Sequence, residues 1–169
     1  MNNIKLSSKA KTLEKLSKEI RSAKILPIFR FDVLSYKKNQ LKILNNIKNF
    51  FKNKLIIRSS SENEDNFQQS NAGRFVSVMD IDANDKQAVK RSIEKVITSF
   101  GKNQKKNDEI FVQSMLKNVT MSGVIFSCDI DTLSSYYVIN YDESGSTNSV
   151  TSGNTNNLKS FICFKEKNN

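Results

Sequence analysis

The sequence predicts an α+β fold with a largely antiparallel sheet. Apolar residues recur at helical spacing in three segments, roughly 9–23, 38–52 and 85–100. Short β-branched and aromatic runs lie between these segments, and several of them follow one another near the end of the chain. Helices mixed with strands, and a closing meander, are typical of α+β domains. At 169 residues and 19.3 kDa, the chain is expected to form a single domain, 1–169.

The first helix is predicted to begin just after Ser8, with Ser7 or Ser8 available as its N-cap. Its apolar positions recur three or four residues apart and line one face: Leu13, Leu16 and Ile20. Pro27 comes next, and apolar residues then alternate with polar ones, which predicts a strand through Phe29, Phe31 and Val33.

A second helix is predicted over residues 38–52, with an inward stripe made of Leu41, Leu44, Ile47 or Lys48, and Phe51. The β-branched stretch KLIIR follows and predicts a short buried strand that ends at Arg58. The alternation in RFVSVMDID predicts another strand, after which Asn84 is expected to cap a third helix.

Three more strands are predicted from EIFVQSML, SGVIFSCDI and SYYVINYD, and a last one from SFICFK. The polar stretch 143–157 separates the last two, and its order is left open. The chain has five glycines. Gly123 and Gly145 each follow a serine at a strand or loop boundary, where either the backbone turns or a ligand approaches.

The composition excludes several kinds of chemistry. The chain has no histidine, so it cannot by itself build a Ser-His-Asp or Cys-His nucleophile, a histidine zinc site or a phosphohistidine carrier. Its net charge is +10, and residues 1–57 hold 14 Lys and Arg against 3 Asp and Glu. This excess indicates either solvated helix faces or a polyanion surface. With no apolar run of membrane-spanning length and no signal-peptide core, a cytoplasmic protein without membrane contact is expected.

Arg58 is the first candidate for a functional role. A guanidinium at the mouth of a buried strand needs a partner, because desolvating an unpaired charge is costly. One possibility is an acid in the loop that follows, among Glu62, Glu64 and Asp65. The other is a phosphate group held also by the nearby serine hydroxyls and by backbone N–H groups near Gly73.

Lys9 is the second candidate. A lysine at the start of a helix lies unfavourably in the helix dipole unless an anion is nearby. A second phosphate contact would account for its position, and an exposed lysine among many would account for it as well.

Five stretches now occur in an informative order: SSKAKTLEKL, LPIF, IIRSSSENEDNFQQSNAGRFVSV, IFVQSMLKNVTMSGVIFSCD and VINYDESGSTNSVTSG. From about residue 7 to about residue 157 the chain resembles the nucleotide-binding domain of the phosphoenolpyruvate synthase and pyruvate phosphate dikinase family, a variant of the ATP-grasp fold. The resemblance implies an ATP-binding part of a phosphotransferase, with ATP and Mg²⁺ as cofactors and a phosphoryl acceptor set elsewhere in the protein.

The resemblance also implies roles for particular residues. Lys9 looks like the family lysine that contacts the ATP phosphates, and Arg58 looks like the catalytic arginine that neutralises charge on the transferred phosphoryl groups. Gly73 matches a loop that covers the phosphates, and Ser77 stands where the family has a threonine. The adenine pocket is matched by Gln113, Met115 and Leu116.

The chain departs from the family pattern at three places. Ser7 and Ser8 replace two glycines before the lysine, and residues 145–148 read GSTN where the family has GLGE. The segment that supplies magnesium ligands in the family has no counterpart here, so the expectation is a truncated domain with no metal ligands of its own. Such a chain is not catalytically complete alone, and a second chain or domain would complete its site.

Two alternatives from other classes stay open. One is a basic, non-enzymatic module that binds nucleic acid through its lysine-rich first third. The other is a degenerate family member retained for protein interaction.

Overall fold

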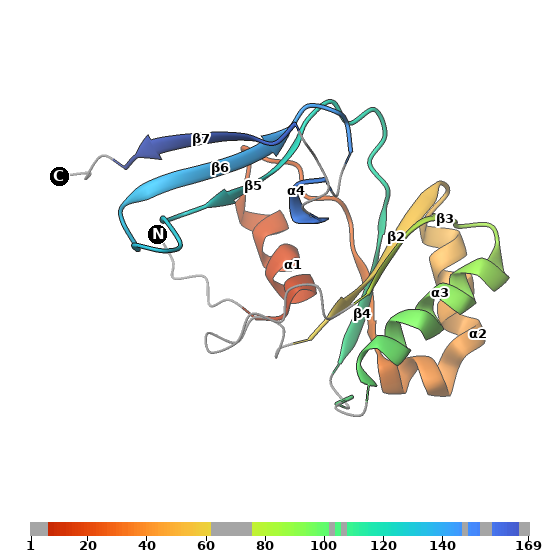
Figure 1. Ribbon diagram of the computed structural model, residues 1–169. Helices are drawn as coiled ribbons and strands as arrows, with labels where there is room; N and C mark the ends of the chain where they lie inside the picture. The colour runs from red at the N-terminus through yellow and green to blue at the C-terminus, as the bar shows by residue number, and fades with distance from the viewer. Residues whose placement is uncertain are drawn as a thin grey trace. The chain divides into compact units, whose positions relative to one another are not determined.

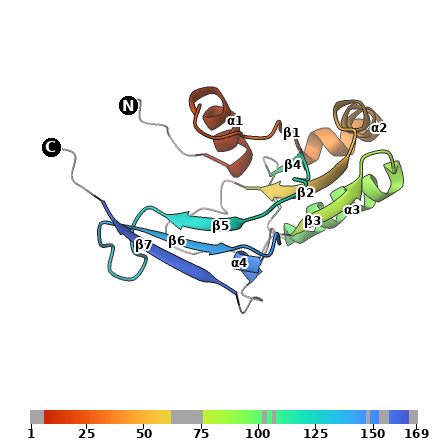
Figure 2. The ribbon, with the colours of Figure 1, turned by 90° about the horizontal axis from the view of Figure 1, so that it is seen from above.

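The computed structural model describes residues 7–61, 76–101, 104–105, 108–146, 149–152 and 157–165, without the side chains of residues 151 and 152. Its contacts divide the chain into two compact units, Met1–Met115 and Leu116–Asn169. Figure 1 labels the helices and strands of both units except β1, which is labelled in Figure 2. Helices flank antiparallel strands, so the predicted α+β class is confirmed.

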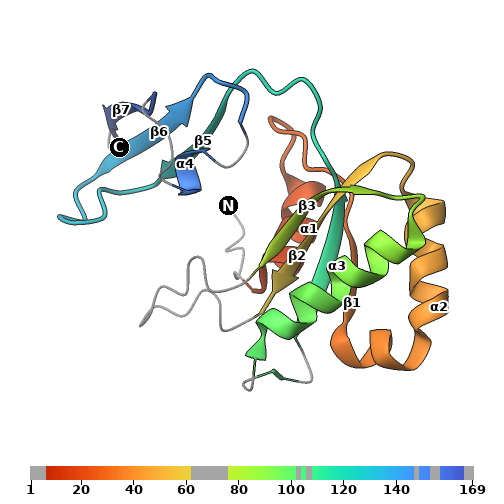
Figure 3. The ribbon, with the colours of Figure 1, turned by 45° about the vertical axis from the view of Figure 1, so that its right-hand side comes forward.

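The first unit holds a four-stranded sheet in the order β1-β4-β2-β3, and every neighbouring pair in it is antiparallel. In chain order its elements are α1 (Lys9–Glu19), β1 (Phe29–Asp32), α2 (Val33–Phe50), β2 (Lys54–Ser60), β3 (Ser77–Asp82), α3 (Lys86–Ser99) and β4 (Glu109–Ser114). Helices α2 and α3 lie on one side of this sheet and α1 lies on the other (Figures 1 and 3).

The hydrophobic core lies between the sheet and the pair α2 and α3. Alternate residues of the central strands point into it because side chains along a strand alternate between the two faces. Leu55 and Ile57 of β2, and Ile110 and Val112 of β4, are fully buried there. The helices contribute the other half of the core, with Tyr36, Ile43, Leu44 and Ile47 from α2 and Val89, Ile93 and Val96 from α3.

The second helix begins five residues earlier than predicted, at Val33. The prediction that Val33 continues the strand was therefore wrong. Asp32 ends β1 and caps α2, and its carboxylate accepts from the backbone N–H of Ser35 at 2.7 Å and from the Ser35 hydroxyl at 2.6 Å. An aspartate followed three residues later by such a donor starts a helix directly, without a connecting loop.

The predicted inward stripe of α2 is confirmed at Leu44, Ile47 and Phe51, which are buried. It was wrong at Leu41, which is 69% exposed. Asn39 has non-helical backbone angles, φ −132° and ψ 39°, so the helix is kinked there. Leu41 lies C-terminal to the kink like the rest of the stripe, and the buried face of this part of the helix is formed by Ile43, Leu44 and Ile47 instead.

Two boundaries also differ from the prediction. Strand β2 does not end at Arg58 but continues through Ser60. Helix α3 is capped by Asp85, whose carboxylate accepts from the backbone N–H of Ala88 at 2.9 Å, and not by Asn84. Either residue type suits an N-cap, so the choice between neighbours depended on backbone geometry that composition does not reveal.

The second unit is a three-stranded antiparallel meander in the order β5-β6-β7. Its strands are β5 (Ser122–Phe126), β6 (Tyr136–Asp142) and β7 (Lys159–Phe164), and the short helix α4 (Ser149–Ser152) lies against β5 and β6 (Figure 2). Three tyrosines lie on β6: Tyr136, Tyr137 and Tyr141. The predicted meander near the end of the chain is confirmed.

Both glycines singled out from the sequence are required by the backbone of this unit. A Cβ at Gly123 would lie 2.7 Å from the carbonyl oxygen of Asn140, on the neighbouring strand. Gly145 has φ +80°, and a Cβ there would lie 2.6 Å from the carbonyl oxygen of Val119. Of the two explanations offered above, a tight backbone accounts for both positions.

None of the helices in the described ranges is long and apolar enough to pass through a membrane.

Candidate functional site

The side of the four-stranded sheet that carries α1 differs in character from the core side. Strand alternation places Glu109, Phe111 and Gln113 of β4 there, and the pairing register adds Arg58 and Ser60 from β2. The register also brings Ser77 of β3 opposite Arg58, and Arg30 of β1 opposite Phe111. We call this surface the α1 face. Charged, amide and hydroxyl groups dominate it, whereas the opposite face is apolar.

Glu109 is the centre of a cluster of charges on the α1 face. Its carboxylate is buried, with one oxygen accepting from the Ser8 hydroxyl at 2.9 Å and the other from the Arg30 guanidinium at 2.8 Å. The Lys11 ammonium lies 3.8 Å from the same oxygen as Arg30. Arg30 in turn donates through Nε to both carboxylate oxygens of Glu14, each at 2.9 Å. Hydrogen bonds and ion pairs thus compensate the buried charge.

The first turn of α1 is held against the strands by two contacts. The hydroxyl of Ser8, the N-cap residue, donates to Glu109 and makes no capping bond to its own helix. The backbone N–H of Ala10 donates to the Ser60 hydroxyl at 3.0 Å, and both groups are buried. Lys9 stands between these two anchors. The Ala10 to Ser60 hydrogen bond therefore brings the backbone of the first turn of α1, which includes Lys9, to the strand that carries Arg58.

Arg58 is half-buried, and its guanidinium carbon lies 5.6 Å from the centre of the Phe111 ring. A guanidinium over an aromatic face is stabilised by the ring quadrupole, by roughly 0.5–2 kcal/mol according to exposure. The contact with Phe111 therefore compensates part of the cost of burying the Arg58 charge. Glu62, Glu64 and Asp65, the acidic candidates, lie outside the described residues.

The pKa of Arg30 is raised from its ordinary value. The largest cause is its hydrogen bond to Glu14, and the nearby negative charges of Glu109 and Glu14 act in the same direction. A guanidinium is already fully charged at neutral pH, so the shift shows that this cluster favours the charged form and has no protonation switch at Arg30.

The other predicted site residues lie in different places. Ser77 is exposed on β3 beside Arg58. Gln113 is on the α1 face, where its amide donates to the carbonyl oxygen of Leu26 at 3.3 Å. Met115 is half-buried at the end of the first unit, whereas Leu116 is 59% exposed at the start of the second. Gly73 lies outside the described residues.

Sequence reasoning missed Glu109, Arg30 and the role of the Ser8 hydroxyl. A signal was present, because Asp108 and Glu109 precede the apolar run IFV directly. Two acids at the start of a buried strand require donors nearby. Asp108 directly precedes β4. Its carboxylate accepts from the Ser61 hydroxyl at 2.8 Å and from the backbone N–H of Lys105 at 2.7 Å.

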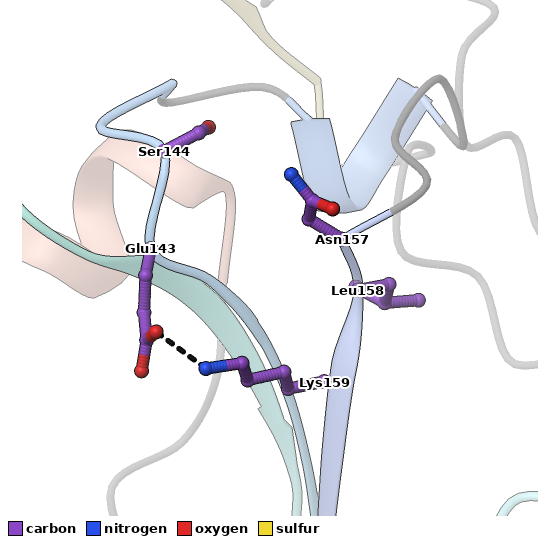
Figure 4. A pocket seen from close by; sticks show the side chains of 5 residues that line it. All are labelled: Glu143, Ser144, Asn157, Leu158 and Lys159. Carbon is purple, nitrogen blue, oxygen red and sulfur yellow. Dashed lines mark hydrogen bonds and ion pairs between the residues drawn. The ribbon is translucent and has the colours of Figure 1, made fainter.

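The second unit holds an open polar pocket of about 480 Å³ (Figure 4). Its lining is Glu143, Ser144, Asn157, Leu158 and Lys159. The Glu143 carboxylate and the Lys159 ammonium form an ion pair across it. This hydrogen bond, together with the negative charge of Glu143, raises the pKa of Lys159. The two opposite charges satisfy each other, so the pocket as built does not select a charged ligand.

Metal ligands are not gathered in the described part of the chain. No group of three or more Cys, Asp or Glu side chains in the described ranges is close enough together to hold an ion. The α1 face therefore offers cations, hydroxyls and amides for an anionic ligand, while a metal ion bound with that ligand would need further ligands.

No protein-family model matches this chain, and no curated protein matches it in sequence.

Proposed function

We propose that the chain binds ATP on the α1 face and is the ATP-binding part of a phosphotransferase resembling phosphoenolpyruvate synthase. The observation that supports the proposal is the hydrogen bond from the Ala10 backbone N–H to the Ser60 hydroxyl. It holds the first turn of α1, which includes Lys9, against the strand that carries Arg58. Two cations beside the start of a helix are suited to a triphosphate.

The roles follow from the chemistry of the side chains. Arg58 neutralises charge on the transferred phosphoryl group, since a guanidinium offers a fork of donors to phosphate oxygens. Lys9 supplies a compact positive charge to the same phosphates, and Ser77 supplies a hydroxyl beside Arg58. Gln113, Met115 and Leu116 contribute to the adenine pocket, and Gly73 to the loop over the phosphates.

Mg²⁺ accompanies ATP in this proposal, and its protein ligands lie outside this chain. When bound, the ion would supply positive charge that neutralises the negative charge developing during transfer. A second chain or domain supplies those ligands and the phosphoryl acceptor, so the chain alone binds ATP weakly and does not transfer phosphate. A cytoplasmic location belongs to the same proposal.

The test is a calorimetric titration of the purified chain with ATP and Mg²⁺, comparing Arg58→Ala and Lys9→Ala with the wild type. We expect each variant to lose about tenfold or more in affinity, because each removes a charge-assisted contact. Two exposed cations serve as matched controls, Arg21→Ala and Lys18→Ala, and should bind as the wild type does.

Two results would overturn the proposal. One is a folded wild-type chain that shows no saturable binding at millimolar ATP. The other is a loss of affinity that is as large in the control variants as in Arg58→Ala. If the control variants also weaken the binding of oligonucleotides, and that binding falls steeply with salt, the nucleic-acid module becomes the better account.

A further inference from the structure

We infer that Ser8, Glu109 and Arg30 form a positioning device that fixes the first turn of α1 and thereby holds Lys9 for the phosphates. The inference rests on the proposed function for its ligand, and it assigns to Glu109 a role that the sequence did not suggest. Glu109 would act through Lys9 and would not itself touch the nucleotide.

The first step is that α1 has little apolar attachment. Ala10 is the buried residue of this 11-residue helix, and the other side chains are half-buried or exposed. A helix of this length is marginal in water without packing to support it. Its place on the sheet must therefore depend largely on the contacts at its first turn.

The second step is that those contacts lead to Glu109. The Ser8 hydroxyl, with Ser8 only 1% exposed, donates to a carboxylate whose other oxygen is occupied by Arg30. Arg30 reaches the helix again through Glu14, further along α1. Glu109 and Arg30 thus hold α1 at two points, and Lys9 follows directly after the first of them.

The third step is that the cluster is balanced without requiring Lys9. The acids Glu109 and Glu14 face the bases Arg30 and Lys11, and their formal charges cancel. A buried carboxylate compensated in this way is rigid, because moving any one partner leaves a charge unsatisfied. Such a cluster fixes geometry, which suits a support for the neighbouring Lys9.

The experiment uses Ser8→Ala in the full chain, with two readouts. The first is hydrogen exchange of the amides of Ala10 and Thr12, which donate to the Ser60 hydroxyl and to the Ser8 carbonyl. We expect exchange to quicken by about threefold to tenfold, as expected for the loss of one buried hydrogen bond. Glu109→Gln should change both amides in the same direction.

The second readout is a double-mutant cycle on ATP affinity between Ser8→Ala and Lys9→Ala. If Ser8 acts by placing Lys9, its substitution should weaken ATP binding by about threefold to tenfold in the wild type. In the Lys9→Ala background the effect should shrink to less than about twofold, since coupled residues are not additive. Ser17→Ala is the matched control, because its exposed hydroxyl donates within α1 to the Glu14 carbonyl.

The outcomes separate this inference from the proposed function. Unchanged exchange of Ala10 and Thr12 in Ser8→Ala would overturn the inference whatever ATP does. Faster exchange with an equal loss of ATP affinity in both backgrounds would also overturn it, because Ser8 would then be structural alone. Faster exchange in a chain that never binds ATP would refute the proposed function and support the fixing of the first turn.

Discussion

Asp32 determines where the second helix begins, and it does so with one carboxylate. Both of its oxygens accept from Ser35, and the pKa of Asp32 is lowered, chiefly by the hydrogen bond from the Ser35 hydroxyl. A lowered folded pKa means that the ionised form stabilises the fold. This contribution is present above the unfolded pKa of about 3.9 and is lost as the pH falls through the lower folded value.

The Asp32→Ala variant should therefore lose about 0.5–2 kcal/mol of unfolding free energy at pH 7. The difference from the wild type should shrink as the pH is lowered below about 4, where Asp32 becomes protonated. Urea unfolding at several pH values measures this. Asp32→Asn is the control, because asparagine caps a helix about as well but does not titrate. A difference from the wild type that is independent of pH would contradict the assignment.

Gly145 offers a second prediction at this scale. A side chain there meets a left-handed backbone, φ +80°, and a carbonyl oxygen 2.6 Å from its Cβ. Gly101 is the matched comparison, with φ +63° and no heavy atom within 4 Å of an added Cβ. Gly101→Ala should cost about 1 kcal/mol from backbone strain alone. Gly145→Ala should cost clearly more in thermal unfolding, and equal costs would show that Val119 moves aside freely.

Strand β2 presents one residue to the core and the next to the α1 face. Ile57 is fully buried under α2 and α3, whereas Ile56 is half-buried on the α1 face. Ile57→Ala should cost about 2–5 kcal/mol of stability, as core truncations do. Ile56→Ala should cost less than half as much. Chemical denaturation of the two variants measures both losses of unfolding free energy. A larger loss in Ile56→Ala than in Ile57→Ala would contradict this assignment of the two faces.

Helix α1 depends on different forces from those that hold α2 and α3. The latter two present apolar stripes to the core, so their existence could be predicted from spacing alone. The spacing of Leu13, Leu16 and Ile20 predicted α1 as well, yet none of the three is buried. Hydrogen bonds to residues distant in the sequence attach α1 to the sheet. Such bonds cannot be predicted from the spacing of apolar residues.

At the scale of the molecule, the two units differ in how well they cover their apolar residues. Several large apolar residues of the meander are mostly exposed, among them Ile125, Phe161, Ile162 and Phe164. A three-stranded sheet gains independent stability by burying a hydrophobic face, and much of the apolar surface of this one is exposed. We expect hydrogen exchange of the β5, β6 and β7 amides to be faster than that of β2 and β4 by at least about tenfold. Equal protection in both units would contradict this.

Much of the architecture could be predicted from the sequence, and the reason is local. The spacing of apolar residues predicts the strands around Ile57, Ile110 and Val138 and the helix around Ile93. The start of α2 and the kink at Asn39 could not be predicted in this way, because capping and kinking depend on backbone angles.

The candidate site was predictable only in part. Lys9 and Arg58 could be proposed from the sequence, and the structure holds the first turn of α1 against the strand that carries Arg58. The contact of Ser8 with Glu109 could not be foreseen, since the two residues are 101 positions apart in the chain. Contacts of that range arise from the sheet order β1-β4-β2-β3, in which β4 is inserted between strands that precede it.

The tyrosines of β6 have a practical consequence for all of these measurements. The chain has no tryptophan and four tyrosines, of which Tyr36 belongs to α2 and the others to β6. Intrinsic emission at the tyrosine wavelength therefore comes largely from the meander. An unfolding curve followed by that emission records the second unit, and one followed by helical circular dichroism records the first. The difference between the midpoints of the two unfolding curves then shows whether the units unfold independently, and no fluorescent label is needed.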